Sequence, residues 1–376
     1  MKTRLFISLI TLASVISAHA AADESTGPPA VLDLARMPTP GESLVWSPLF
    51  QACWDKLGAM HAGRMEKVEP ANALIDLLNQ TQWKKDDVMP KDGYGLYAGP
   101  STKEFADATA AEIEKKFGVK STPPEISTTP GAIAVHGILV RDLIFKSPFY
   151  RSNNKPLDFK DSTGTIHKVA FFGTAGIYSD SYIRQVKVID YKEDGKSFIL
   201  TLATDKEDES IIIYRPEQAM SFEKAITQVE TASKSPFAGS YGELTDKGLH
   251  KNDTLKIPCL TLDSNTKFTS QLKGAMYYAG DSVPWEIMMA YQTTRFELSE
   301  KGVKIRVESG AACDPFGSPP PPPPCVPRNF ICDGPFFVFA WRKQAAWPYF
   351  AAWIDSKAAL TPFSPGPDTR EKANHR

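Results

Sequence analysis

The histidines and serines of this chain could support metal binding or nucleophilic catalysis, but their spacing favours neither. Metal-ligand spacing is absent among His61, His136, His167, His250 and His375. Ser179 and Ser181 do not stand in the sequence context of a nucleophile elbow. We therefore expect neither an enzyme nor a metal or cofactor site. With 43 basic and 44 acidic residues, the chain also has no charge excess that would favour nucleic acid.

Two of the five cysteines flank the least foldable segment of the chain. Cys313 and Cys325 lie on either side of a run of six prolines. Cys53 falls on the apolar face of a predicted helix and Cys332 in a predicted core strand, so we expect both to be inert buried thiols. Cys259 has no evident partner in its strand. The expected disulfide is therefore Cys313–Cys325.

The residues that follow Gly302 alternate like those of a strand. Val303, Ile305 and Val307 would face one side, and the charged residues between them would face the other. This pattern is typical of a segment that can lie in a sheet with one face buried.

The first 20 residues have the features of a secretory signal peptide. A basic start precedes an apolar run from Leu5 to Ile16, and Ala18 and Ala20 are the small residues of a cleavage site. We expect cleavage after Ala20 and a secreted or periplasmic protein. No other apolar stretch approaches the roughly 20 residues of a membrane-spanning helix, so we expect no membrane partner.

The elements that must position these residues change character along the chain. Helical patterns dominate the first third: a strand over 43–46 leads into a helix that opens at Ser47 with Pro48 in its first turn, and further helices are expected over 71–80 and 101–118. From Lys168, short β-branched and aromatic runs predict strands over 168–173, 184–191, 197–204, 210–216, 253–263 and 293–310. A helix is expected over 221–229, a buried hairpin over 336–354, and a solvated turn over 204–210. These patterns predict an α+β fold with mainly antiparallel sheets.

The order of these elements resembles the serpin superfamily. The similarity runs from Glu42 to Ile354 and is carried by "SLVWSPLFQACWDKLGA", "LIFKSPF", the central hairpin "VKVIDYKEDGKSFILTLATDKEDESIIIYRP", "TTRFELSEKG" and "FICDGPFF". The resemblance implies helices packed around mainly antiparallel sheets and an exposed reactive-centre loop over about 303–329. Two departures from the family are a short segment ahead of Glu42 and too few residues between Phe117 and Ile144 for the helix that crosses the main sheet.

The resemblance implies a role for particular residues. In the family an acidic residue precedes a hinge glycine, which corresponds to Glu300 and Gly302, with Val303, Ile305 and Val307 as the segment that would insert. Family spacing places the scissile bond between Phe316 and Gly317, which suits a chymotrypsin-like protease; Ala311 or Ala312 would suit an elastase-like one. Ser47 and Pro48 would be shutter-like residues.

Three interpretations of the loop stay open at this point. Residues 303–308 could be an extension of the preceding strand, always paired; they could insert after cleavage, as in an inhibitor of a serine protease; or the loop could be cleaved or bound without insertion. We expect an exported serpin-like inhibitor that presents this loop as bait to a chymotrypsin-like or elastase-like serine protease. The bulk of the hinge side chains favours the alternative, a non-inhibitory secreted binding protein with the proline-rich loop as contact surface. We expect a monomer with a signal peptide over 1–20, a polar lead over 21–41, one serpin-like domain over 42–356 and a flexible tail over 357–376.

Overall fold

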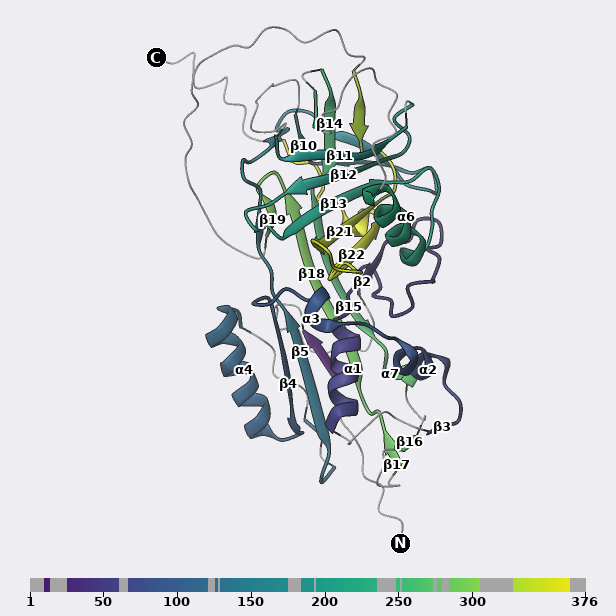
Figure 1. Cartoon of the computed structure of the whole chain (residues 1–376), viewed down its shortest axis with the longest axis vertical. Coiled ribbons are helices and arrows are strands. Elements are labelled where there is room, and N and C mark those ends of the chain that lie inside the picture. Colours follow the sequence, from purple (N-terminus) through teal and green to yellow (C-terminus); the bar gives the residue numbers. More distant parts are fainter. Residues whose placement is uncertain are drawn as a thin grey trace.

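Figure 1 shows the computed structural model of the chain, with its strands grouped around two large sheets. The structure describes residues 10–13, 26–60, 67–120, 126–127, 129–174, 184–192, 194–234, 248–250, 252–272, 276–278, 284–304 and 327–365.

The largest sheet has the strand order β4-β5-β1-β18-β19-β6, and β15 pairs with the other side of β18. Its strands are β4 (Tyr94–Pro100), β5 (Ile133–Leu139), β1 (Ile10–Ala13), β18 (Ala290–Ser299), β19 (Gly302–Lys304), β6 (Leu143–Ile144) and β15 (Leu260–Lys267). Strand β1 runs parallel to both β5 and β18, whereas β19 runs antiparallel to both β18 and β6. One edge of β18 is thus paired with two different segments, β1 at its start and β19 at its end. We refer to this sheet as the main sheet.

A second sheet has the strand order β11-β12-β13-β21-β22-β2. It consists of β11 (Val186–Tyr191), β12 (Phe198–Ala203), β13 (Glu209–Arg215), β21 (Phe336–Arg342), β22 (Phe350–Ile354) and β2 (Leu44–Trp46). Strands β21 and β22 form the buried antiparallel hairpin that the sequence predicts.

Three smaller sheets complete the strands. A four-stranded sheet with the order β20-β14-β10-β7 contains β20 (Asn329–Ile331), β14 (Thr254–Pro258), β10 (Phe171–Gly173) and β7 (Tyr150–Arg151). The others contain β17 (Pro284–Glu286), β16 (Met276–Tyr278) and β3 (Lys67–Glu69), and β8 (Leu157–Lys160) with β9 (Ile166–Val169). The helices are α1 (Leu49–Met60), α2 (Ala73–Gln80), α3 (Lys85–Val88), α4 (Lys103–Phe117), α6 (Phe222–Lys234), α7 (Thr269–Leu272) and the 3₁₀ helix η1 (Lys357–Ala359). The α+β class with mainly antiparallel sheets is confirmed.

The main sheet is supported from one side by two different neighbours. Helix α1 lies against β5 (Figure 1), where the predicted apolar face of the helix is fully buried. Farther along, β18 packs on the second sheet through Phe296, whose ring stacks on Phe350 of β22 with centroids 4.4 Å apart. The far face of the second sheet is covered by α6, with Phe222 against Phe337. Along its length, the main sheet therefore packs on α1 in one part and on the second sheet in another.

Residues 357–361, which the sequence predicts to begin a flexible tail, are packed on the domain. Residues 357–359 form η1, and Ala359 and Leu360 are buried. The backbone amide of Thr361 donates to the carbonyl oxygen of Cys259 at 2.9 Å. Ala359 and Leu360 are apolar and buried, although the segment that contains them is rich in polar residues. The packed domain therefore extends past residue 356.

Candidate functional site

The predicted hinge is a tight reversal between two strands. After β18 the chain turns at Glu300 and Lys301, and β19 returns antiparallel, so that Ser299 pairs with Gly302. The carbonyl oxygens of Glu300 and Lys301 accept hydrogen bonds from the amides of Phe149 (2.8 Å) and Phe145 (3.0 Å). The Glu300 carboxylate lies 3.4 Å from the Arg151 guanidinium. The turn is therefore fixed to the segment that follows β6.

Strand β19 lies between β18 and β6, inside the main sheet. Val303 pairs with Leu298 on one side and with Leu143 on the other. Its side chain is 6% exposed and faces the interior. Residues 303 and 304 are paired, as one interpretation of residues 303–308 expects, but they do not extend the preceding strand, because the chain has reversed and occupies a new position beside β18.

The same interstrand position continues toward the other end of the sheet. Strand β1 pairs with β18 from Ala290 to Thr293 and with β5 from Val135 to Gly137. No direct pairing joins β5 to β18 within the described residues. We call the space between β18 on one side and β5 and β6 on the other the slot. Two segments far apart in sequence, β1 and β19, occupy its two ends.

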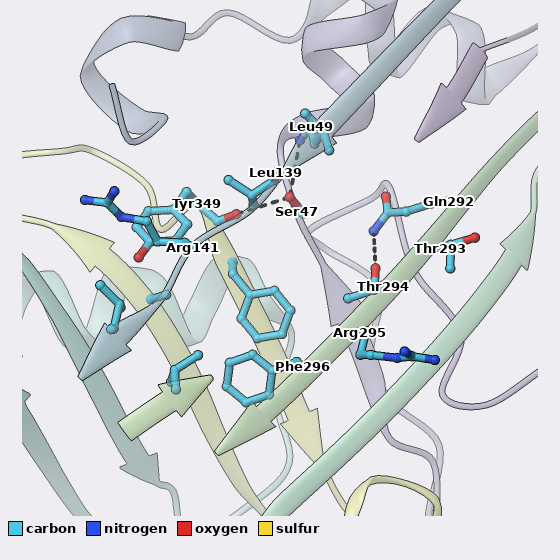
Figure 2. Close-up of a pocket in the computed structure, with 14 residues that line it drawn as sticks. Ser47, Leu49, Leu139, Arg141, Gln292, Thr293, Thr294, Arg295, Phe296 and Tyr349 are labelled. Carbon is cyan, nitrogen blue, oxygen red and sulfur yellow. Dashed lines mark hydrogen bonds between the residues drawn. The ribbon is translucent and has the colours of Figure 1, made fainter. Parts of the chain in front are cut away.

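A narrow cavity of about 50 Å³ lies beneath the slot between these two segments. Figure 2 shows its lining, in which Phe296 and Leu139 face the same space from opposite sides. Its apolar wall is completed by Val303, Leu143, Ala340, Phe350 and Leu49. The cavity is far smaller than the roughly 300–1,000 Å³ of small-molecule sites. Its size and lining instead suit aliphatic side chains from a strand above it.

A chain of polar contacts borders this cavity. The Ser47 hydroxyl donates to the carbonyl oxygen of Tyr349 at 3.1 Å, and the Tyr349 hydroxyl donates to Oε2 of Glu209 at 2.8 Å. The same carboxylate accepts from Nε of Arg141 at 2.8 Å and also contacts Nη2 of Arg141. Burial and the nearby Glu209 carboxylate raise the pKa of Tyr349 well above its usual value. The network joins the start of α1 to the slot at Arg141.

The structure corrects the prediction for Glu209. A solvated turn is expected over 204–210, but Glu209 opens β13 and its side chain is 1% exposed. The strand alternation that buries Ile211 and Ile213, continued back by two residues, places Glu209 on the same inner face. The alternation in the sequence indicates that Glu209 is buried, but the charged residues around it favour an exposed turn.

Ser47 and Pro48 lie where the sequence predicts, at the start of α1. Ser47 is buried, and its hydroxyl accepts from the amide of Leu49 at 3.3 Å while it donates to Tyr349. The carbonyl of Pro48 accepts the first bond of the helix, from Ala52, at 2.9 Å. Ser47 thus fixes the helix start to the edge of the cavity.

The remaining predicted residues divide into two groups. Ile305, Val307, Ala311, Ala312, Cys313, Phe316, Gly317 and Cys325 lie outside the described residues. Cys53, Cys259 and Cys332 are buried, unbridged thiols. Burial raises the pKa of Cys259 to about 12 and those of Cys53 and Cys332 further. Inert core thiols are what the sequence predicts for Cys53 and Cys332.

The described residues show neither a metal-binding cluster nor a membrane-spanning helix. Across the described ranges, no group of three or more His, Cys, Asp or Glu side chains could hold a metal ion. No helix within the same part of the chain is long and apolar enough to cross a membrane.

Comparison with known proteins places the fold. No family model matches the sequence, and no curated protein does. The structure is similar to the native state of tengpin, a thermophilic serpin, with 12% identity over 85% of this chain and 89% of that chain and a TM-score of 0.51. It is similar to human thyroxine-binding globulin complexed with thyroxine (12%, 85% and 94%, 0.50) and to native protease nexin-1 with heparin (14%, 84% and 92%, 0.50). The chain therefore has the serpin fold.

Proposed function

We propose that this protein, which has the fold of the serpins, is an exported inhibitor of a chymotrypsin-like or elastase-like serine protease. The observation that supports this function best is the position of β19, which already lies in the slot with the Val303 side chain buried. The segment that follows β19 needs only to continue along the same path to enter the sheet further.

The register of β19 determines which residues of the main sheet an inserted segment would pair with. Continued by two residues, it sets Ile305 opposite Phe296 on β18 and Arg141 on the other side. Continued by four, it sets Val307 opposite Thr294 and Leu139. Paired residues share a face of the sheet, so both aliphatic side chains would point toward the cavity beneath the slot. Bulky hinge residues are compatible with insertion because that cavity can receive them.

The opposite face of the inserted segment would meet charged residues. Lys304 pairs with Glu297, a complementary charge. Arg306 would come opposite Arg295, whose guanidinium is held 2.7 Å from Asp263 on β15. That neighbouring carboxylate reduces the repulsion between the two arginines.

The proposed reaction starts with the exposed loop as bait. A serine hydroxyl of the protease attacks the carbonyl carbon of Phe316, the bond to Gly317 breaks, and the amine of Gly317 leaves, so the protease is esterified to Phe316. Once the expected Cys313–Cys325 bridge across the cut is reduced, insertion of the cut segment satisfies backbone donors and acceptors on both sides of the slot. The attached protease would be carried along before water can release it.

Removal of the signal peptide would change which residues occupy the slot. Cleavage after Ala20 would remove β1, which pairs with both β5 and β18. The exported chain would then have the part of the slot beyond β19 free to receive the loop.

A secreted binding protein that keeps the fold without insertion is the second candidate. The observation that favours it is the size of Val303 and Ile305 compared with the small hinge residues typical of fast insertion. Such a protein would be nicked by a protease and leave that protease fully active.

The deciding experiment is incubation of the processed protein with chymotrypsin-like, elastase-like and trypsin-like proteases, followed by denaturing gels. Inhibition by trapping gives a covalent complex that survives denaturation, and mass spectrometry of its peptide identifies the acylated residue. A nicked chain with undiminished protease activity against all three would overturn the inhibitor function and favour the binding protein.

A further inference from the structure

A hollow of about 540 Å³ lies between the polar lead and helices α1, α2 and α6. Its walls come from residues 32–35 of the lead, the start of α1, the end of α2 and one side of α6, together with Trp46 and Trp347. The volume falls within the roughly 300–1,000 Å³ of small-molecule sites. We refer to this space as the hollow.

The wall that the lead supplies is fixed to the rest of the domain. The lead runs beside β2 and α6 (Figure 1), where the amide of Val31 donates to the carbonyl of Val45 at 2.8 Å. The amide of Glu223, in the first turn of α6, donates to the carbonyl of Leu34 at 2.9 Å. The hollow is therefore formed before any ligand enters, and a preformed site loses less free energy to ordering when it binds.

Gln51 brings a buried amide with a free acceptor to the hollow. Its side chain lines the hollow and the residue is 8% exposed. Nε2 of Gln51 donates to Oδ1 of Asp55 at 2.8 Å and to the carbonyl of Leu78 at 2.9 Å, so both amide protons are used. Oε1 accepts no hydrogen bond from any residue that the structure describes. Because buried polar atoms nearly always have a partner, this oxygen favours a ligand that carries a hydrogen-bond donor.

Asp55 also positions the aromatic wall of the hollow. Its Oδ2 accepts from Nε1 of Trp83 at 2.7 Å. The Trp83 ring stacks on Trp347 with centroids 6.4 Å apart, and Trp46 meets Trp347 edge to face at 6.2 Å. The free acceptor of Gln51 and the ring of Trp347 are thus held through one carboxylate. Tryptophan rings receive both hydrocarbon groups and cations.

The charged side chains that line the hollow are all acidic. They are Asp33, Glu223 and Glu230, and none of the described lining residues is a lysine, arginine or histidine. Glu230 makes one long ion pair, at 4.0 Å, with the exposed Lys234. Among the described residues, neither Asp33 nor Glu223 has a cationic partner within ion-pair distance. Negative charge gathered in a concave site attracts a cation.

We propose that the hollow binds a small organic amine. The ammonium group donates to Oε1 of Gln51 in the field of the three carboxylates, and the hydrocarbon body lies against Trp347 and the leucines of the walls. An organic cation is favoured over a metal ion, because the described residues hold no cluster of carboxylates suited to a metal. This site does not rest on the proposed function, since the amine neither enters the slot nor contacts the loop.

The test titrates the processed protein with 2-phenylethylamine and with 2-phenylethanol, which has a hydroxyl in place of the ammonium group. Binding is followed by calorimetry and by tryptophan fluorescence, because Trp46 and Trp347 line the hollow. We expect the amine to bind saturably, about tenfold more tightly than the alcohol, and to change the fluorescence. Equal affinities for the two probes, or no saturable binding of the amine at millimolar concentrations, would overturn the proposal.

Charge variants show whether the amine occupies this hollow. Asp33→Asn with Glu223→Gln removes two exposed lining carboxylates. The matched control is Glu104→Gln with Glu114→Gln, which removes two exposed carboxylates from α4, one of them also in the first turn of its helix. The first variant should weaken the amine several-fold and leave the alcohol unchanged, and the control should match the wild type. Equal affinities of the two variants for the amine would place it elsewhere and overturn the site.

Gln51→Met tests the proposed contact with the ammonium group. It keeps the length of the side chain and removes Oε1. The amine should lose more affinity than the alcohol, because a hydrogen bond from a charged donor is the stronger one. The substitution also removes the hydrogen bonds to Asp55 and Leu78, so the melting temperature is measured alongside. An equal loss for the two probes in a folded Gln51→Met would overturn the contact with Gln51.

Discussion

Gly302 lies so close to Leu143 that a Cβ built on the glycine would stand 2.2 Å from the Leu143 carbonyl oxygen. Its φ of +127° is also one that side chains rarely adopt. The glycine therefore allows β19 to turn into the slot beside β6. We expect Gly302→Ala to displace β19 and to lower the free energy of unfolding by more than the roughly 1–2 kcal/mol of left-handed backbone strain alone.

Gly118 provides the matched control for Gly302. It has a φ of +67°, but nothing lies within 4 Å of a Cβ built there. Urea unfolding should show a loss for Gly118→Ala near the strain value of about 1 kcal/mol, and a larger loss for Gly302→Ala. Equal losses would mean that contact with Leu143 does not determine the hinge.

Glu209→Gln should destabilise the protein by removing the counter-charge of Arg141. The Glu209 side chain is 1% exposed and contacts both Arg141 and Tyr349. Breaking a buried pair costs about 3 kcal/mol or more, although partial exposure of Arg141 reduces this. Glu217→Gln removes the carboxylate of the exposed Lys192–Glu217 pair and should change the free energy of unfolding far less. Similar unfolding free energies for both variants would contradict this interpretation.

His136 should make the fold sensitive to acid. It lies in β5, is fully buried, and burial lowers its pKa from 6.5 to about 4. Between pH 4 and pH 6.5, the His136 side chain is protonated in the unfolded chain and neutral in the folded chain. Stability is therefore complete above about pH 6.5 and falls as the pH drops toward 4, by about 3 kcal/mol in all.

The contribution of His136 can be separated from that of the carboxylates by substitution. In His136→Gln, urea unfolding between pH 7.5 and pH 4.5 should show a shallower loss than in the wild type, because one proton uptake has been removed. Parallel pH profiles for the two proteins would exclude His136 as the cause.

The strand and helix patterns of the sequence predict most of the fold, because local periodicity indicates which face of each element is buried. Alternation identified the Phe336–Ile354 hairpin, and the serine and proline before Leu49 identified the start of α1. The position of β19 could not be derived in this way. Alternation after Gly302 shows that Val303 has a buried side but does not tell whether the chain continues straight or reverses, which depends on the close approach of Gly302 to Leu143.

The polar parts of the site were harder to predict because they depend on partners distant in sequence. Arg141 and Glu209 are 68 residues apart. Each lies among other charged or polar residues in the sequence, where a solvated position is the ordinary expectation. A buried charge is decided by whether a counter-charge reaches it, and a single sequence does not contain that information.

The last prediction tests insertion through Ile305, which the register of β19 places opposite Phe296 and above the cavity. Once the loop of the wild-type protein is cut, a new strand should enter the slot. Each kcal/mol shifts the melting temperature of a domain of this size by about 2–4 °C, so several added strand pairs should raise it by on the order of 10 °C. Ile305→Arg would place an unpaired charge over the apolar cavity, so the cut protein should gain little and the protease should be released active.

Lys304→Arg is the control, because residue 304 pairs with Glu297 and the substitution keeps the positive charge. The melting temperature of each protein is measured before and after nicking by a chymotrypsin-like protease, together with the fraction of protease held in covalent complex. Lys304→Arg should behave like the wild type in both measurements. An equal rise in melting temperature for Ile305→Arg and Lys304→Arg would show that residue 305 does not enter the slot, and the absence of a rise in all three would exclude insertion.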